Sequence, residues 1–327
     1  MSKIYLTGGR LRSTIFRKLE EWQSTDQACI IEIDPEKNQS RTCVEYTSPQ
    51  EACADELPAI LFKSASVREN KLYACTSTEV LIYELPNFQL LHYISLPCFN
   101  DLHHVCPSSR GTILVVVTGL DLVVEITTTG QLVREWSVLG EDTWARFSRQ
   151  IDYRKVPTTK PHKSHPNHAF ELNGDVWVTR LRQQDAVCLT TPGPRIDVAV
   201  QRPHDGFLFG EKIYFTTVDG HVVIAGQESL LVEQVVDLNA MTKSDQTLGW
   251  CRGVLPLDQC RMWVGFTRVR PTKFVENVSW IRHGAHLHRP SHIALYDVES
   301  KKCEQEIEIE PHGIGVVFSL LSIPQIA

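Results

Sequence analysis

The chain has 327 residues, of which 42% are hydrophobic and 22% are charged, with a formal net charge of −6. This composition suits a packed globular core, and the acidic balance gives no electrostatic basis for binding nucleic acid. The sequence shows no secretory leader pattern, no basic run and no apolar run of membrane-spanning length, and its ten cysteines form no CxxC pair. We therefore expect a cytoplasmic protein with reduced cysteines and no membrane partner.

From residue 58 onward the chain repeats one pattern of four short apolar strands, separated by turns rich in Gly, Asp, Asn and Pro. The repeats occupy residues 58–97, 100–140, 166–201, 203–238 and 249–310. Each repeat has the composition of β-strands, and a repeat of this length is typical of the blades of a β-propeller.

The two ends of the chain complete one more repeat. Residues 312–323 supply a lone inner strand, and KIYLTGG, ACIIEID and RTCVEYT near the start supply the other three strands. Such a blade would close the ring through its termini and leave no free sheet edge. We therefore predict an all-β, six-bladed β-propeller formed by a single domain over residues 1–327. An open array of β-sandwiches is the main alternative, but it does not explain the complementary ends.

Three insertions interrupt the repeats, at residues 8–27, 138–165 and 270–291. The first contains STIFRKLEEWQ, which predicts a short amphipathic helix with Ser13 or Thr14 as its N-cap. In a propeller, the loops between second and third strands share a face with the loops between blades. All three insertions are therefore predicted on the face where the inner strands begin, and long loops on one face indicate a functional face.

The heads of the inner strands are predicted to line the central channel near that face. Counting back about ten residues from each second strand gives Lys63 or Ser64, His103 or His104, Asn167 flanked by His165 and His168, His204 beside Asp205, Arg252, and His312. Because side chains alternate along a strand, only one of His103 and His104 is expected to face the channel, and likewise one of Asn167 and His168. The sequence does not decide which.

Several neutral imidazoles at one level of a ring predict a site for a divalent transition metal: Fe, Zn, Cu, Ni or Mn. The candidate ligands are His103, His104, His165, His168, His204 and His312. Asp101 and Asp205 are expected to orient these imidazoles. Two alternatives remain: a metal-free site for a carboxylate or phosphate, and a water-filled polar channel whose histidines only form hydrogen bonds.

The candidate site residues are assigned roles by their chemistry. The candidate catalytic residues are His104, His168, Arg252 and Lys63. The candidate substrate-binding residues are Arg252, Arg268, Asn167 and Asp205. The cations would hold an acid group, and a histidine that binds no metal would serve as acid or base. A second cluster, His283, His286, His288 and His292, is interpreted as solvated surface or a lid.

The motifs DLHH (101–104), HPNH (165–168), PHDG (203–206), CRG (251–253) and VGFTRVR (264–270) together resemble an uncharacterised family of bacterial β-propeller proteins. The resemblance implies that the equivalent positions are Asp101, His103, His165, Asn167, His204, Arg252 and Arg268. The chain departs from that pattern at His104, where the family tends to an acid, and at His168, where it tends to Gly. More distantly, the architecture is similar to gluconolactonase and strictosidine-synthase-like propellers, whose acidic and Asn metal ligands are absent here.

Two classes of function fit these features. The leading hypothesis is a metal-dependent enzyme of small-molecule metabolism acting on a small polar, anionic substrate at the top of the channel. Hydrolysis, elimination, cyclisation, isomerisation and oxygenation all fit the residues. The alternative is a metal-free ligand-binding or protein-interaction scaffold, against which the absence of a WD signature counts mildly.

Overall fold

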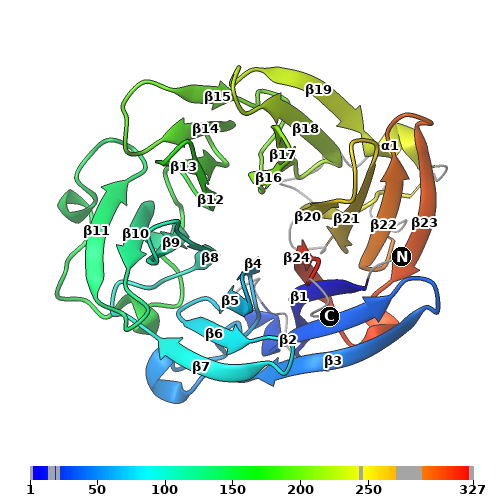
Figure 1. Ribbon diagram of the computed structural model, residues 1–327. Helices are drawn as coiled ribbons and strands as arrows, with labels where there is room; N and C mark the ends of the chain where they lie inside the picture. Colours follow the sequence, from blue (N-terminus) through cyan, green and yellow to red (C-terminus); the bar gives the residue numbers. More distant parts are fainter. Residues whose placement is uncertain (1–2, 14–18, 20–22, 243–245, 270–288, 324–327) are drawn as a thin grey trace.

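The repeats found in the sequence fold as six four-stranded antiparallel sheets arranged in a ring (Figure 1). This computed structural model describes residues 3–13, 19, 23–242, 246–269 and 289–323. The predicted fold class, an all-β six-bladed β-propeller, is confirmed. No helix within these ranges is both long and apolar enough to cross a membrane.

Each blade consists of an inner strand, two middle strands and an outer strand. The inner strands are β24 (Val316–Leu321), β4 (Ser64–Arg68), β8 (Leu102–Pro107), β12 (Pro166–Leu172), β16 (Phe207–Phe209) and β20 (Trp250–Pro256). The second strands are β1 (Ile4–Leu11), β5 (Lys71–Cys75), β9 (Ile113–Val117), β13 (Asp175–Arg180), β17 (Lys212–Thr216) and β21 (Arg261–Thr267). The third strands are β2 (Thr25–Asp34), β6 (Val80–Glu84), β10 (Leu122–Ile126), β14 (Asp185–Cys188), β18 (His221–Gly226) and β22 (His292–Asp297). The outer strands are β3 (Gln39–Tyr46), β7 (Gln89–Ile94), β11 (Leu132–Ser137), β15 (Arg195–Asp197), β19 (Val232–Asp237) and β23 (Lys302–Glu308).

The ring closes as the sequence predicts. The C-terminal strand β24 pairs antiparallel with β1, with Tyr5 opposite Leu321 and Gly9 opposite Val316. The sheet order is β24-β1-β2-β3, so one blade is built from both ends of the chain. This arrangement pairs the inner edge of β1, which would otherwise be a free sheet edge.

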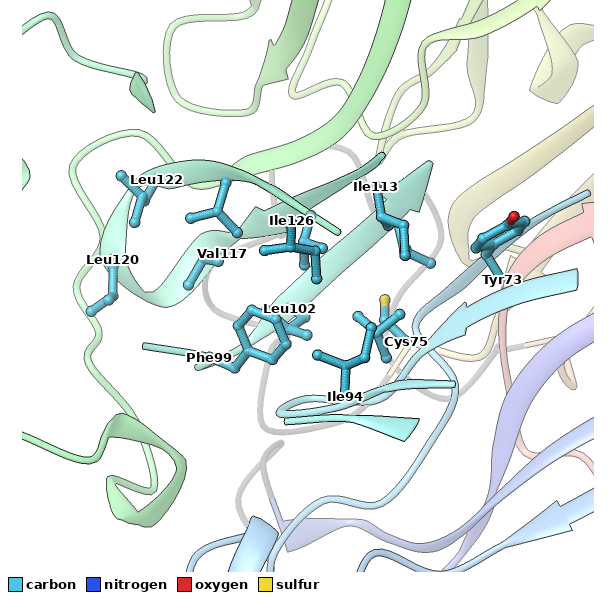
Figure 2. Close-up of a cluster of buried hydrophobic side chains, with 14 of the residues drawn as sticks. Tyr73, Cys75, Ile94, Phe99, Leu102, Ile113, Val117, Leu120, Leu122 and Ile126 are labelled. Atoms are coloured by element: carbon cyan, nitrogen blue, oxygen red, sulfur yellow. The ribbon is translucent and has the colours of Figure 1, made fainter. Parts of the chain in front are cut away.

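The hydrophobic core lies between the faces of adjacent blades (Figure 2). Tyr73 and Cys75 on β5 pack in one cluster with Ile113 and Val117 on β9 of the next blade. Strands rich in β-branched residues suit this packing, because both faces of each middle strand are covered by a neighbouring blade. All ten cysteines are free thiols that lie within the described ranges.

The insertions are only partly described. The helix predicted within residues 8–27 falls largely outside the described residues, as does most of 270–291. Residues 138–165 contain two short 3₁₀ turns, η4 (Thr143–Ala145) and η5 (Tyr153–Lys155). Asn100 Nδ2 donates hydrogen bonds to the backbone oxygens of Tyr153 and Val156, both at 2.8 Å, and so fixes this segment to the head of β8.

Candidate functional site

Each inner strand, or the segment leading into it, brings two consecutive residues to the central channel. We call the face where the inner strands begin the upper face. The upper ring consists of Lys63, His103, Asn167, His204, Arg252 and Phe318. The lower ring consists of Ser64, His104, His168, Asp205, Gly253 and Ser319. An upper cavity of about 130 Å³ opens above the upper ring, and a lower cavity of about 660 Å³ opens below the lower ring.

β-Bulges explain why consecutive residues both reach the channel. The pairing of β8 with β9 skips His103, and the pairing of β12 with β13 skips Asn167. The pairing of β24 with β1 skips Phe318, and that of β20 with β21 is irregular at Arg252 and Gly253. A bulge leaves a residue unpaired and re-aims its side chain, so the alternation of faces is broken there. Bulged residues at one level of four blades therefore build most of the upper ring.

Because of the bulges, the expectation that only one residue of each neighbouring pair faces the channel is wrong. His103 and His104 both line the channel, His103 in the upper ring and His104 in the lower ring. Asn167 and His168 are divided between the two rings in the same way. His165 lies above Asn167, in the wall of the upper cavity.

His312 does not line the channel, and the expectation that it does is wrong. Its ring Nδ1 lies 2.8 Å from Oγ of Ser40, on the outer strand β3. The inner strand β24 begins only at Val316, because residues 310–312 form a 3₁₀ turn. The closing blade therefore contributes Phe318, an aromatic side chain, to the upper ring.

An ion pair between Lys63 and Asp101 forms part of the wall of the upper cavity. Lys63 Nζ donates a hydrogen bond to Asp101 Oδ1. Burial acts to raise the pKa of Asp101, but the positive charge of Lys63 and the contact with His103 outweigh burial and hold it well below its usual range. The charge of Lys63 is therefore balanced by an ionised carboxylate.

His103 directs an unprotonated nitrogen toward this pair. Asn167 Nδ2 donates to the backbone oxygen of Pro203 at 2.8 Å, so Asn167 Oδ1 must accept from His103 Nδ1, at 2.7 Å. His103 Nε2 lies 3.4 Å from Asp101 Oδ1. Burial and the charge of Lys63 lower the pKa of His103 to about 4. At pH 7 the ring is neutral, and Nε2 is available to accept a proton.

Two more histidines, from the 138–165 insertion, lie next to this group: His165 contacts His103, and His162 contacts His165. His165 packs edge-on against His103, with ring centroids 4.8 Å apart, and its Nδ1 lies 2.9 Å from Nδ1 of His162. Burial lowers the pKa of both rings, that of His165 to well below its usual range. Asp101 (φ 50°) and His165 (φ 58°) both have left-handed backbone, a conformation that persists where the surroundings fix it and that is enriched at functional sites.

The opposite wall of the upper cavity is positive and aromatic. The guanidinium carbon of Arg252 lies 4.6 Å from the ring centroid of Phe318 and 5.5 Å from that of Trp250. Arg252 Nε donates a hydrogen bond of 3.4 Å to His204 Nε2. Burial and the charge of Arg252 hold the pKa of His204 well below its usual range, so its ring is also neutral at pH 7.

The lower ring holds two stacked imidazoles. The rings of His104 and His168 lie 3.6 Å apart between centroids, with 24° between their planes. His104 Nδ1 accepts a hydrogen bond of 3.3 Å from the backbone N–H of Ala169, which places the ring proton of the neutral form on Nε2, 3.4 Å from Ser66 Oγ. Burial lowers the pKa of His168 to about 3 and that of His104 well below its usual range.

Asp205 is the acidic side chain of the lower ring. Its Oδ2 accepts hydrogen bonds from Thr216 Oγ1 and, at 2.9 Å, from the backbone N–H of Gly253. Burial raises the pKa of Asp205 to about 6, against the lowering effect of these bonds and of Arg252. Asp205 was expected to orient an imidazole, but its carboxylate bonds instead to a hydroxyl and a backbone amide of adjacent strands.

The remaining predicted residues lie away from the rings. Arg268 lies in the wall of the upper cavity, and its guanidinium forms a bidentate pair with Glu310, at 2.9 and 2.6 Å. His292 is buried at the start of β22 and stacks on Phe266, with ring centroids 4.8 Å apart. The other predicted members of its cluster, His283, His286 and His288, lie outside the described residues.

The described residues do not form the predicted metal site. Within the described ranges, no group of three or more His, Cys, Asp or Glu side chains is placed to hold a metal ion. The imidazoles are divided between two levels, and several of their nitrogens are engaged elsewhere. His103 Nδ1 bonds to Asn167, and His204 Nε2 accepts from Arg252.

Two parts of the upper cavity, and a histidine in contact with His165, are not anticipated from the sequence. His162 belongs to an insertion that is His-rich in sequence, and the spacing of His162 and His165 is the signal that marks the pair. Phe318 carries no signal, because an apolar residue in an inner strand is indistinguishable from core. The connection from β3 to β4, residues 47–63, supplies Ser48, Cys53 and Pro58 to the cavity, and no motif in the sequence marks it.

Comparison with known proteins shows the fold alone. No protein-family model matches the chain, and no curated protein matches it. A protein of unknown function from Bacteroides caccae is 12% identical, with a TM-score of 0.60 and 98% of each chain covered. A chain of a nidogen/laminin complex is 8% identical, with a TM-score of 0.57 and coverage of 99% of this chain and 100% of that one. Virginiamycin B lyase from Staphylococcus aureus is 15% identical, with a TM-score of 0.45 and coverage of 72% and 69%.

Proposed function

We propose that the upper cavity binds a small molecule carrying an acid group, and that His103 acts on the bound molecule as a general base. The observation that carries the proposal is the position of a neutral, oriented imidazole in the same cavity as Arg252, on the opposite wall. The proposal makes the protein an enzyme of small-molecule acid–base chemistry.

Arg252 supports binding of an acid group. Its guanidinium brings a positive charge to the wall of the upper cavity. Its contacts with Phe318 and Trp250 place it against apolar surface, where a guanidinium is weakly hydrated and binds carboxylate or phosphate well. A small cavity of about 130 Å³ suits a small anion or the acid end of a larger one.

His103 supports proton abstraction. Its Nδ1–H is held by Asn167, which leaves Nε2 as the basic atom. Asp101 Oδ1, 3.4 Å from Nε2, would stabilise the imidazolium that forms when Nε2 takes a proton. His165, packed edge-on against His103, fixes the plane of the ring.

The experiment uses the wild-type protein and two variants, Arg252→Gln and His103→Gln. Binding of small mono- and dicarboxylates and of sugar phosphates is measured by thermal shift and calorimetry. Exchange of the carbon-bound hydrogens next to the acid group is followed by NMR in D₂O. Arg252→Gln is expected to weaken anion binding by roughly tenfold or more, because it removes a charged hydrogen-bond donor. His103→Gln is expected to keep binding and to abolish hydrogen exchange.

Three outcomes bear on the alternatives. Anion binding that is unchanged in Arg252→Gln would overturn the proposal. Binding without exchange or turnover in the wild type would favour a ligand-binding protein. Elemental analysis of the untagged protein beside His204→Ala tests the metal hypothesis: about one equivalent of a transition metal, lost in the variant, would replace the acid–base proposal with a metal centre.

A further inference from the structure

The lower cavity is larger than the upper one and differs from it in its walls. Its volume is about 660 Å³. Apolar side chains from the ends of the inner strands form much of the wall: Val67, Phe170, Phe207, Phe209, Leu255, Leu257 and Leu320. Its inner end is formed by the lower ring, including Asp205, His104 and His168. An apolar wall with a few convergent polar groups at one end is the usual composition of a small-molecule site.

Asp205 presents an oxygen to this cavity. Its Oδ2 is held by Thr216 and Gly253, whereas Oδ1 has no hydrogen-bond partner among the described residues. The side chain lines both the neck between the rings and the lower cavity, and it keeps a partly exposed surface. An acceptor oxygen in an apolar surrounding is expected to find a donor, and the protein supplies none within the described ranges.

His168 adds a second polar group at the same end. Its ring is stacked on His104, which fixes its plane, and it remains partly exposed to the cavity. Neither ring nitrogen of His168 forms a hydrogen bond with a described residue. A neutral imidazole supplies one donor and one acceptor.

The charged side chains nearer the mouth of the lower cavity have partners within the protein. Lys3 pairs with Glu32 at 2.7 Å, and Arg68 Nη1 donates to the backbone oxygen of Pro107 at 3.4 Å. Glu171 accepts from the backbone N–H and the hydroxyl of Ser109. The carboxylate of Asp205 therefore dominates the charge at the inner end, although Arg252 lies above it in the upper ring.

We propose that the lower cavity is a second ligand site, which binds a small amine with an apolar body. The ammonium group donates to Asp205 Oδ1, a further donor or acceptor of the ligand meets His168, and the apolar body lies along Phe207 and Phe209. An ammonium ion beside a carboxylate in an apolar site forms a strong, charge-assisted hydrogen bond. The two cavities thus have opposite preferences, an anion above and a cation below.

The test compares three probes of similar shape: 2-phenylethylamine, 2-phenylethanol and phenylacetate. Calorimetry at pH 7.5 is expected to show the amine binding at least roughly tenfold more tightly than the alcohol or the acid, because only the amine pairs with a carboxylate. Equal binding of the three probes, or no binding of the amine at millimolar concentration, would overturn the proposal.

Two variants locate the amine. Asp205→Asn is expected to weaken amine binding by roughly tenfold or more. Glu171→Gln, which removes a carboxylate from the same cavity but away from its inner end, is expected to change affinity less than about threefold, as rim charges do. Equal effects of the two variants would contradict a site at Asp205.

A measurement on the wild type keeps the proposal testable if Asp205→Asn does not fold. Asp205 is partly protonated near pH 6, and an ammonium ion beside it favours the ionised form. Amine binding is therefore expected to release protons at pH 6 and none at pH 8, as measured in two buffers of different ionisation enthalpy. Absence of proton release at pH 6 would overturn the assignment. His103→Gln, which tests the upper cavity, is expected to leave amine binding intact, so the two proposals fail separately.

Discussion

Lys63 and Asp101 belong to neighbouring blades, and their ion pair joins the head of β4 to the head of β8. Both side chains are largely buried, with 9% and 20% of their surfaces exposed. Asp101 has left-handed backbone, which Asn also tolerates. Asp101→Asn therefore removes the charge without changing the backbone preference, and it leaves Lys63 as an unpaired buried cation.

Asp101→Asn is expected to lower the free energy of unfolding by roughly 3 kcal/mol, the usual cost of breaking one side of a buried ion pair. The double variant Lys63→Met/Asp101→Asn is expected to recover most of that loss, because no uncompensated charge remains. Urea denaturation of the wild type, both single variants and the double variant measures the coupling. Additive losses would show that the two charges do not interact in the folded protein.

The stacked histidines of the lower ring predict acid sensitivity. The pKa of His168 is about 3 in the folded protein and near 6.5 in an unfolded chain, so the unfolded state binds the proton first as pH falls. Stability is therefore lost as pH falls below about 6.5, by up to about 1.4 kcal/mol per pH unit for this residue, until pH approaches 3. Asp205, whose raised pKa favours folding at lower pH, acts in the opposite direction.

His168→Gln removes one contribution to this slope. Between pH 7 and pH 5 the free energy of unfolding of the variant is expected to fall by about 2 kcal/mol less than that of the wild type. His92→Gln serves as the control, since His92 is exposed on the outer strand β7. Thermal or urea unfolding at several pH values gives the slope of the unfolding free energy against pH for the wild type and the two variants. Parallel slopes for His168→Gln and the wild type would mean that His168 titrates normally.

A substitution at Gly8 on β1 tests closure of the ring, because Gly8 lies against the backbone of β24. A Cβ atom at Gly8 would lie 1.8 Å from the backbone oxygen of Val316 on β24. Gly8→Ala must separate the two strands, and we expect a loss of about 3 kcal/mol in the free energy of unfolding. Gly111→Ala is the control: a Cβ there meets no atom within 4 Å, and only its φ of 79° opposes the change, at a cost of about 1 kcal/mol. Equal losses in the two variants would refute the steric argument.

The fold can be predicted from the sequence more completely than the candidate site. Each blade is a local repeat of four strands with turn residues between them, so its pattern is visible in a short window of sequence. The complementary ends, 312–323 and the strands before residue 47, identify the closing blade without any structural information. The blades follow from the composition of the strands and from the spacing of the turns, and both can be read from the sequence.

The site depends on register, which the sequence does not fix. Counting back from the second strands brings Lys63, Asn167 and Arg252 to the channel, but a bulge decides that His103 and His104 both reach it. A bulge has no reliable sequence signal, since it changes pairing by one residue. The start of the inner strand in the closing blade is equally uncertain from the sequence, and for that reason His312 was predicted to line the channel.

The ion-pair partners of the charged side chains cannot be predicted from the sequence either. Arg268 was a candidate for binding an acid group, and it binds Glu310 of the same chain, 42 residues away. Asp101 and Lys63 are 38 residues apart and meet only because neighbouring blades bring their inner strands together. Contacts of this kind follow from the twist and packing of the blades rather than from any local pattern.

The pairing of β24 with β1 has a consequence for how the protein is made. Residue 5 leaves the ribosome more than three hundred residues before its partner, Leu321. At about 5–20 residues per second, β1 waits roughly 15–60 s during synthesis with its inner edge unpaired. For that time the nascent chain exposes a template for strand addition by another chain, so its yield is expected to depend on translation rate and on chaperones that cover that edge.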